Sequence, residues 1–144
     1  MTLIDDFAGR FSFLSNFHPS RITWEGREWE TVEHAYQAAK TLDEADVYKI
    51  WACPTPGQAK HLGQRVKLRP DWDVVKFEIM LSLLRLKFAI PELRDQLFAT
   101  KGAKLVEGNT WHDKIWGVCV CARCGNKGEN HLGRQLEQVR AEIT

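Results

Sequence analysis

One segment of this sequence has a strong helical period, which constrains the fold more than any other feature. Between residues 73 and 88, apolar side chains recur at i, i+4, i+7 and i+11, at Phe77, Leu81, Leu84 and Phe88. An α-helix has about 3.6 residues per turn, so this spacing places the four side chains on one face. We therefore expect residues 73–88 to form the central helix of the fold.

Capping signals predict further helices. Thr31 and Asp43 belong to the residue types that cap helix N-termini, and Thr55-Pro56 joins a cap to a proline at the first helical position. Pro91 is a second such start signal. These signals and the intervening patterns predict helices over residues 31–40, 43–51, 55–62, 91–99 and 132–143.

Short strands are expected between the helices. Aromatic and polar residues alternate in Phe11-Ser12-Phe13 and over residues 22–30, where Gly26 marks the turn of a hairpin. The run from Trp116 to Cys121 is also extended in character. Because strands do not alternate regularly with helices, a Rossmann-type sheet is not expected. The predicted fold class is mainly α with a few short β-strands (α+β), in a single domain over residues 1–144.

Composition narrows the classes of function. The chain has 144 residues, 44% hydrophobic and 27% charged, which is typical of one globular domain. A formal net charge of +1 gives no sign of a nucleic-acid binder or an acidic tail. No apolar run approaches the roughly 18 residues of a membrane span, and the N-terminus has no secretory pattern. We expect a cytoplasmic protein without a membrane partner.

The segment 31–40 places an acid and a base on one helix face. Glu33, Gln37 and Lys40 follow one another at i, i+4 and i+7, with Tyr36 at the edge of their stripe. The opposite face is built from small apolar residues that allow close packing. A carboxylate and an amine on one stripe are what acid–base chemistry requires, although a solvated helix face has the same pattern.

Two aperiodic segments combine aromatic and polar side chains. In residues 11–17, Ser15-Asn16 lies among aromatic residues that include Phe13. A turn is the favoured interpretation, and an amide presented to a ligand between stacking rings is the alternative. In residues 105–117, indole faces stand beside short polar side chains that suit ribose hydroxyls and base edges. The candidate ligand-binding residues there are Asn109, Trp111, Asp113 and Trp116.

The start of the last helix is rich in glycine and asparagine. Over residues 128–134, this composition is expected to leave backbone N–H groups free for an anion such as phosphate. Capping of the helix by Asn130 is the alternative.

The cysteines allow a metal site without requiring one. Cys119, Cys121 and Cys124 are close in sequence, but a fourth ligand would have to come from Cys53, His112 or His131. We favour reduced thiols, the first two in a strand and the third in a turn, and we expect no metal and no cofactor.

Together these segments resemble the NADAR, or YbiA-like, family. The resemblance rests on residues 13–17, 31–40, 105–113, 116–117 and 128–133, in that order, and it covers about residues 7 to 140. It implies an N-glycosidase with a mainly helical fold. Some members of the family resemble enzymes that cleave phosphoribosylamino-pyrimidine intermediates of riboflavin synthesis. Others resemble enzymes that remove ADP-ribose from guanine in DNA.

The resemblance also implies roles for individual residues. Glu33 and Lys40 are expected to be catalytic, and the pocket is expected to be shaped by Asn16, Asn109, Trp111, Asp113, Trp116 and Asn130. The cysteine-bearing segment Cys119–Lys127 is an insertion relative to the family pattern. We add Asp113 as a second acid–base group, and Phe13, Ser15, Tyr36 and Gln37 as further substrate-binding candidates.

Three functions therefore follow from the sequence. The first is an N-glycosidase acting on a small ribosylated or ADP-ribosylated substrate, with nucleic acid included as a candidate carrier of that group. The second is a non-catalytic reader of ADP-ribose or nucleotide groups. The third is a zinc-knuckle interaction protein, which we rank last.

Overall fold

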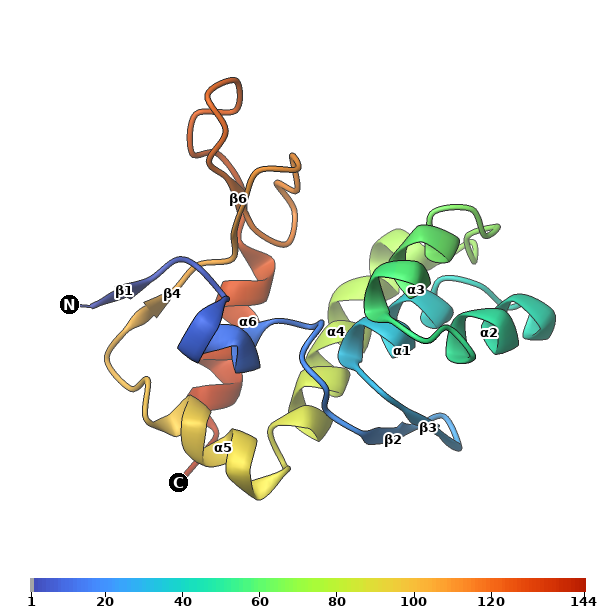
Figure 1. Cartoon of the computed structure of the whole chain (residues 1–144), viewed down its shortest axis with the longest axis horizontal. Helices are drawn as coiled ribbons and strands as arrows, with labels where there is room; N and C mark the ends of the chain where they lie inside the picture. The colour runs from blue at the N-terminus through green and yellow to red at the C-terminus, as the bar shows by residue number, and fades with distance from the viewer. Residues whose placement is uncertain (1) are drawn as a thin grey trace. The chain divides into compact units, whose positions relative to one another are not determined.

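The computed structural model describes residues 2–144 and divides into two compact units (Figure 1). Unit 1 combines the chain up to Ser15 with Phe88–Thr144, and unit 2 is Asn16–Lys87. The α-helices are α1 (Val32–Ala39), α2 (Glu44–Trp51), α3 (Pro56–Gly63), α4 (Trp72–Lys87), α5 (Pro91–Phe98) and α6 (His131–Ala141). The 3-10 helix η1 is Gly9–Leu14, and the strands are β1 (Leu3–Ile4), β2 (Ile22–Trp24), β3 (Arg27–Trp29), β4 (Lys104–Leu105), β5 (Gly108–Asn109) and β6 (Val118–Cys119). The predicted α+β class is confirmed.

Unit 2 is built around α1. This helix contacts α2, α3 and α4, and all eight of its residues are buried. The Thr31 hydroxyl caps it by accepting a hydrogen bond from the backbone N–H of His34 at 3.1 Å. The small side chains of Ala35, Ala38 and Ala39 let neighbouring helices approach closely on several sides. The sequence analysis was therefore wrong in making residues 73–88 the central helix, because α1 occupies that position within unit 2.

The buried face of α4 also differs from the predicted stripe. Leu84 is buried as expected, but Phe77 and Leu81 are only half-buried. The buried positions of the helix are Trp72, Met80, Leu83, Leu84 and Lys87. Phe88, just after the helix, is also buried as predicted, so the predicted stripe is right at its C-terminal end, and the burial of Lys87 cannot be recognised from hydropathy.

The expected hairpin over residues 22–30 is present in unit 2. Strands β2 and β3 pair antiparallel, with Ile22 opposite Trp29. The two turn residues, Glu25 and Gly26, have φ values of 52° and 73°. Positive φ at both positions is the geometry of a type I′ turn, which matches the twist of the flanking strands.

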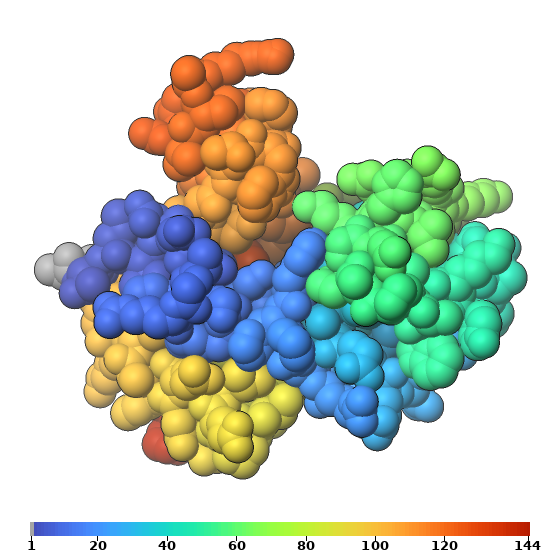
Figure 2. Space-filling view, viewed as in Figure 1, coloured from blue at the N-terminus to red at the C-terminus, as the bar shows by residue number. Residues whose placement is uncertain are grey.

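Unit 1 contains two short parallel ladders against helices. Strand β1 pairs with β4, and β5 pairs with β6. Helix α6 packs on β4, and α5 contacts both α6 and η1. The segment between β5 and α6, drawn in orange, projects beyond the rest of this unit (Figure 2).

The predicted strand at Phe11-Ser12-Phe13 is wrong, because these residues belong to η1. Backbone hydrogen bonds run from Phe11 to Ala8 and from Ser15 to Ser12, at 3.0 and 2.9 Å. These i→i+3 bonds define a 3-10 helix. An alternation of three residues is too short to distinguish that helix from a strand. Over residues 2–144, no helix is both long and apolar enough to cross a membrane.

Candidate functional site

The acid of the α1 stripe is enclosed by protein. Glu33 is 7% exposed and Gln37 is 3% exposed. The Gln37 side-chain amide donates a hydrogen bond of 2.5 Å to Oε2 of Glu33. A solvated helix face would leave both side chains in water, so this alternative interpretation of the stripe is excluded. The helix instead holds a carboxylate in a defined position.

The base of the stripe stands at the end of α1. Lys40 is the C-cap residue, and its Nζ lies 5.6 Å from the centre of the Tyr36 ring. Burial lowers the pKa of Lys40, the charge of Glu33 opposes this shift, and the charges of Lys60 and Lys76 add to it. The lysine and the carboxylate therefore interact electrostatically, and the amine loses its proton more readily than an exposed lysine does.

Gln37 is positioned by a close approach between two helices. A Cβ placed on Gly63 of α3 would lie 1.9 Å from Oε1 of Gln37, so only glycine fits there. That oxygen is buried and has no hydrogen-bond partner among the described residues. Gly63 was not selected from the sequence, because the predicted helix ended at residue 62, whereas α3 includes this glycine.

Asn16 approaches the start of the same helix. Its backbone carbonyl accepts the N–H of Glu33 at 3.1 Å, and residues 15–17 form the turn that the sequence favoured. The side-chain amide contacts the Met80 sulfur at 3.6 Å. Its Oδ1 is buried without a hydrogen-bond partner in the part of the chain described. Unit 2 thus brings together Asn16, Glu33, Tyr36, Gln37 and Lys40.

In unit 1, Asn109 organises the loop that follows β5. Its Nδ2 donates to the carbonyl of Asp113 at 2.9 Å and to Oε2 of Glu107 at 3.2 Å. Its Oδ1 accepts the N–H of Asp113 at 3.1 Å. Oδ1 of Asp113 then accepts the N–H groups of Ile115 and Trp116. These bonds fix the loop and leave the Asn109 side chain with protein partners at both ends.

The two tryptophans of this loop differ in exposure. Trp111 is 56% exposed at the turn of the loop. Trp116 is half-buried, with its ring edge-on to His131 at 6.3 Å between centroids. A Cβ on Gly117 would lie 1.8 Å from Oε2 of Glu107, so this glycine is required by the close approach of the two segments. Glu107, like Gly63, is a positioning residue that the sequence analysis did not select.

The start of α6 is not the open anion site that the sequence predicted. The N–H groups of His131 and Leu132 donate to the carbonyls of Ile115 and Trp116, at 3.1 and 2.9 Å. That of Asn130 donates to Gly117 at 3.3 Å. The loop carbonyls therefore occupy the donors that a phosphate would need.

Asn130 is the N-cap residue of α6, as the alternative predicted, but its side chain does not act as a cap. Within the described residues, this side chain makes no capping hydrogen bond. Its Nδ2 donates to the carbonyl of Leu105, and its Oδ1 accepts the N–H of Glu107, both at 3.0 Å. Asn130 has φ 55°, a left-handed conformation that asparagine tolerates better than most residues. It joins Leu105 of β4, and Glu107 two residues further on, to the start of α6.

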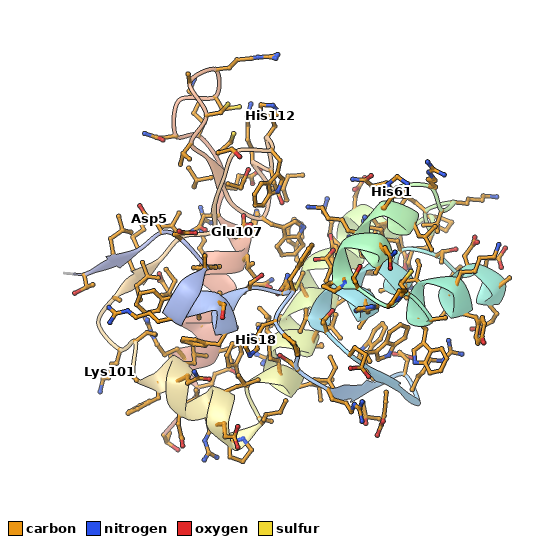
Figure 3. The ribbon with its side chains drawn as sticks, in the orientation of Figure 1. Asp5, His18, His61, Lys101, Glu107 and His112 are labelled. Atoms are coloured by element: carbon orange, nitrogen blue, oxygen red, sulfur yellow. The ribbon has the colours of Figure 1, made fainter. Side chains whose placement is uncertain are left out.

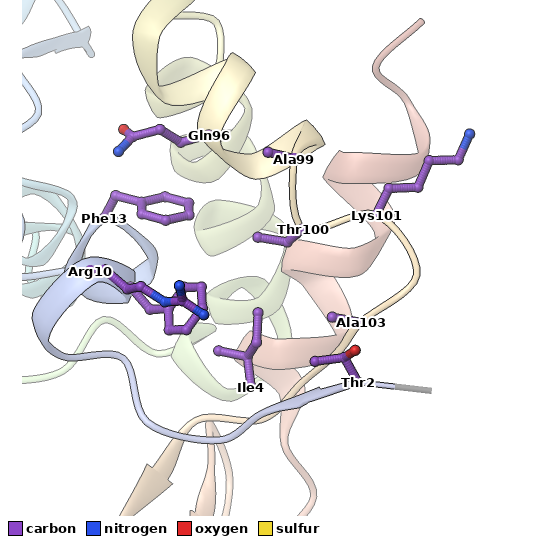
Figure 4. Close-up of a pocket in the computed structure, with 10 residues that line it drawn as sticks. Thr2, Ile4, Arg10, Phe13, Gln96, Ala99, Thr100, Lys101 and Ala103 are labelled. Carbon is purple, nitrogen blue, oxygen red and sulfur yellow. The ribbon is translucent and has the colours of Figure 1, made fainter.

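Phe13 and Ser15 lie at the end of η1. Phe13 is buried and lines a cavity of about 440 Å³ in unit 1, together with Arg10, Thr100 and Lys101 (Figure 4). Ser15 is the C-cap of η1. The predicted site residues thus fall into two groups, each organised inside its own unit. Unit 1 carries Phe13, Ser15, Asn109, Trp111, Asp113, Trp116 and Asn130.

One further cluster offers metal ligands. His112 lies with the thiols of Cys119, Cys121 and Cys124, and their ligand atoms are all within 4.8 Å of one another. All four cysteines are free thiols. His131 pairs with Glu129 at 3.0 Å, and Cys53 is outside the cluster.

Comparisons with known proteins agree on one family. The family model described as NADAR domain matches residues 6–144. N-glycosidase Npun_R5314 of Nostoc punctiforme is 41% identical over 92% of this chain and 86% of its own length. N-glycosidase YbiA of Shigella boydii is also 41% identical, over 90% of this chain and 80% of its own.

Two other matches extend this finding. The solved NMR structure of the E. coli protein YbiA superposes with a TM-score of 0.84 at 36% identity, covering 99% of this chain and 84% of that one. The riboflavin biosynthesis protein PYRR of Zea mays is 35% identical over 92% of this chain, which corresponds to 23% of that longer protein.

Proposed function

Because the chain belongs to the NADAR domain family, we propose that it hydrolyses the C–N bond of a phosphorylated ribosylamine, with Glu33 and Lys40 performing the chemistry. The relatives named N-glycosidase confirm the expectation of a hydrolase that acts on N-glycosyl compounds. The substrate and the roles of individual residues are the proposal.

The observation that carries the proposal is the coupling of Glu33 with Lys40. A non-catalytic reader has no need of an acid and a base that share one enclosed stripe. Here the carboxylate is buried and bonded to Gln37, and its charge acts on the amine of Lys40. Burial shifts the lysine toward its neutral form, which is the nucleophilic form of an amine.

We propose a covalent route through Lys40. The ribose ring opens to an iminium at C1′ as the ring oxygen O4′ takes a proton from solvent, and the neutral Lys40 amine adds to that carbon. Glu33 transfers the proton released by the amine to the leaving nitrogen, and the C1′–N bond to the base breaks. The product is an imine between Lys40 and C1′. Water then adds to this imine, and its hydrolysis releases the ribose and regenerates the lysine.

Charge near the amine supports a phosphorylated substrate. Lys60 and Lys76 are both close enough to Lys40 to lower its pKa. A phosphate would offset this group of like charges. Because one relative is named a riboflavin biosynthesis protein, we favour a phosphoribosylamino-pyrimidine over ADP-ribosylated guanine in DNA, which is the second candidate.

For the aromatic loop of unit 1, the roles expected from the sequence stand as proposals. We assign stacking to Trp111 and Trp116, and a second acid–base role to Asp113. Asn109 and Asn130 support this loop through their hydrogen bonds, which is a positioning role.

Matched variants test the catalytic assignment. Glu33→Gln should lower turnover by roughly 10²–10⁴-fold, the usual contribution of acid–base catalysis, while substrate binding measured by calorimetry is retained. Exposed Lys67→Ala is the control and should leave both unchanged. Each variant should be assayed on a phosphoribosylamino-pyrimidine and on ADP-ribosylated DNA in parallel. Full activity of Glu33→Gln on both substrates would refute the proposal.

Reductive trapping tests the covalent route. Borohydride added during turnover should fix the opened sugar on Lys40, to be located by peptide mass mapping. Lys40→Arg keeps the charge but cannot form the imine, so it should lose both the adduct and turnover. If Lys40→Arg remains active and no adduct forms on the wild type, water attacks C1′ directly and Lys40 is not the nucleophile.

A further inference from the structure

A histidine and three cysteines converge in the projecting segment of unit 1. Nδ1 of His112 and the sulfurs of Cys119, Cys121 and Cys124 all lie within 4.8 Å of one another. In Figure 3, His112 is labelled in this segment, with sulfur atoms in yellow beside it. Cys119 and Cys124 are buried, Cys121 is half-buried and His112 is exposed. Four soft ligand atoms gathered around one point are typical of a metal site.

The spacing of these atoms matches tetrahedral zinc. Zn–S bonds of about 2.3 Å and Zn–N bonds of about 2.0–2.1 Å place nitrogen about 3.6 Å from each sulfur in a regular tetrahedron. The distances from Nδ1 of His112 are 3.2 Å to Cys124, 3.6 Å to Cys119 and 3.7 Å to Cys121. Only small shifts are needed to accept the ion.

The backbone around Cys121 and Cys124 forms a tight turn. The N–H of Gly125 donates to the carbonyl of Cys121 at 3.0 Å, and that of Cys124 donates to the Cys121 sulfur at 3.3 Å. Gly125 and Asn126 both have positive φ, at 64° and 61°. An N–H group aimed at a sulfur stabilises a thiolate, which is the form that binds metal.

Cys119 and His112 complete the site from two other segments. Cys119 ends β6, and its N–H donates to the carbonyl of Lys127 at 2.9 Å, which closes the cysteine loop at its base.

His112 is turned toward the thiols by an unusual backbone conformation. Its φ is 68°, in the left-handed region that costs a residue with a side chain about 1–2 kcal/mol. Hydrogen bonds of Asn109 to both the N–H and the carbonyl of Asp113 hold this turn. The residue pattern does not predict this turn, so it left His112, His131 and Cys53 as candidates for the fourth metal ligand.

We propose that His112, Cys119, Cys121 and Cys124 bind one zinc ion as a structural Cys3His site. Four protein ligands fill a tetrahedral ion and leave no open position for a water nucleophile, so the role is structural. His112 lies between Trp111 and Asp113, and the ion therefore joins the loop that carries these residues to the cysteine insertion. The site stands on its own geometry and does not depend on the proposed reaction.

Metal analysis tests the site without any activity assay. Wild-type chain purified from zinc-supplemented culture without chelators should contain one zinc per chain by elemental analysis. Cys121→Ser should lose most of the zinc, whereas Cys53→Ser, the matched control outside the cluster, should retain it. His112→Ala should bind zinc more weakly, and His112→Cys should restore binding as a four-thiolate site.

Cobalt substitution keeps the test decisive if a variant fails to fold. The wild type exchanged with Co²⁺ should show the intense visible bands of tetrahedral cobalt with thiolate ligands, and zinc should displace them. The proposal is refuted if wild-type zinc does not exceed that of a Cys119→Ser/Cys121→Ser/Cys124→Ser triple variant. Absence of the cobalt bands from the wild type, or loss of zinc from Cys53→Ser alone, would also refute it.

Discussion

Replacing Gly63 by alanine tests whether packing between α1 and α3 holds the carboxylate of Glu33, proposed to be catalytic, in place. The new Cβ would lie 1.9 Å from Oε1 and 2.7 Å from Cδ of Gln37, a buried side chain that must then move. Overpacking of this kind costs about 1–3 kcal/mol. Moving Gln37 also breaks its hydrogen bond to Glu33, and losing a bond to a charged group costs roughly 1.5–3 kcal/mol.

Gly57 provides a control in the same helix. A Cβ there meets only the Thr55 hydroxyl, at 4.0 Å, so Gly57→Ala gains helix propensity without a clash. In urea unfolding, Gly63→Ala should be less stable than Gly57→Ala by about 2.5–6 kcal/mol, the sum of the two costs. Its turnover should fall by roughly 10-fold or more, whereas Gly57→Ala should keep wild-type turnover.

A double-mutant cycle separates the clash from other effects. Gln37→Ala removes the two atoms nearest to the new Cβ, Oε1 and Cδ, so Gly63→Ala should cost little stability in that background. The coupling energy should recover most of the cost of the single Gly63→Ala change. Equal stability and turnover of Gly63→Ala and Gly57→Ala would show that the Gln37 side chain is loosely held, contrary to the reasoning.

Three other predictions concern stability. Burial lowers the pKa of Lys87 from 10.5 to about 7, so between these pH values the unfolded chain binds more protons than the folded chain. The free energy of unfolding should therefore rise with pH, by about 3 kcal/mol from pH 6 to 9. Urea melts of Lys87→Met should lack this rise. Asn130→Ala removes both bonds to the backbone of Leu105 and Glu107 and should cost about 2–4 kcal/mol, and a loss below 1 kcal/mol would contradict their importance. Thr31→Val removes the cap of α1 and should cost about 1–2 kcal/mol in thermal melts, whereas Thr31→Ser should cost little.

Local signals in the sequence were sufficient to locate most helices. Thr31, Asp43 and Thr55 each cap the helix that they predicted, because a side chain that binds the first free N–H groups acts within three residues. The hairpin was found for the same reason, since its turn residues determine its geometry. The helix caps and the hairpin turn both depend on residues that are neighbours along the chain, and interactions of this kind can be predicted from the sequence alone.

Properties set by distant contacts were not recovered. Lys87 is buried in the core face of α4, and nothing in its neighbours along the chain indicates that. The start of α6 has the composition of an anion site, but carbonyls from residues 115–117 occupy its donors. Pairing of β1 with β4 joins segments about a hundred positions apart, between strands of only two residues each.

In the candidate site, too, local features were predicted from the sequence and features set by distant contacts were not. The stripe of Glu33, Gln37 and Lys40 followed from helical spacing, but its burial depended on how α2, α3 and α4 cover α1. The functional assignment of Asn109 and Asn130 remains a prediction, and their hydrogen bonds within unit 1 show that both also support the fold. An asparagine that binds a ligand and one that braces a loop look the same in a sequence.

The bonds that Asn109 makes across the loop have a consequence for affinity. Because both ends of its amide are tied to Asp113, the intervening backbone is already restricted before any ligand arrives. Ordering a flexible segment on association costs free energy, and a segment that is rigid beforehand avoids much of that cost. In its proposed stacking role, Trp111 would bind a flat heterocycle with little loss of backbone entropy. Asn109→Ala should weaken this binding mainly through entropy.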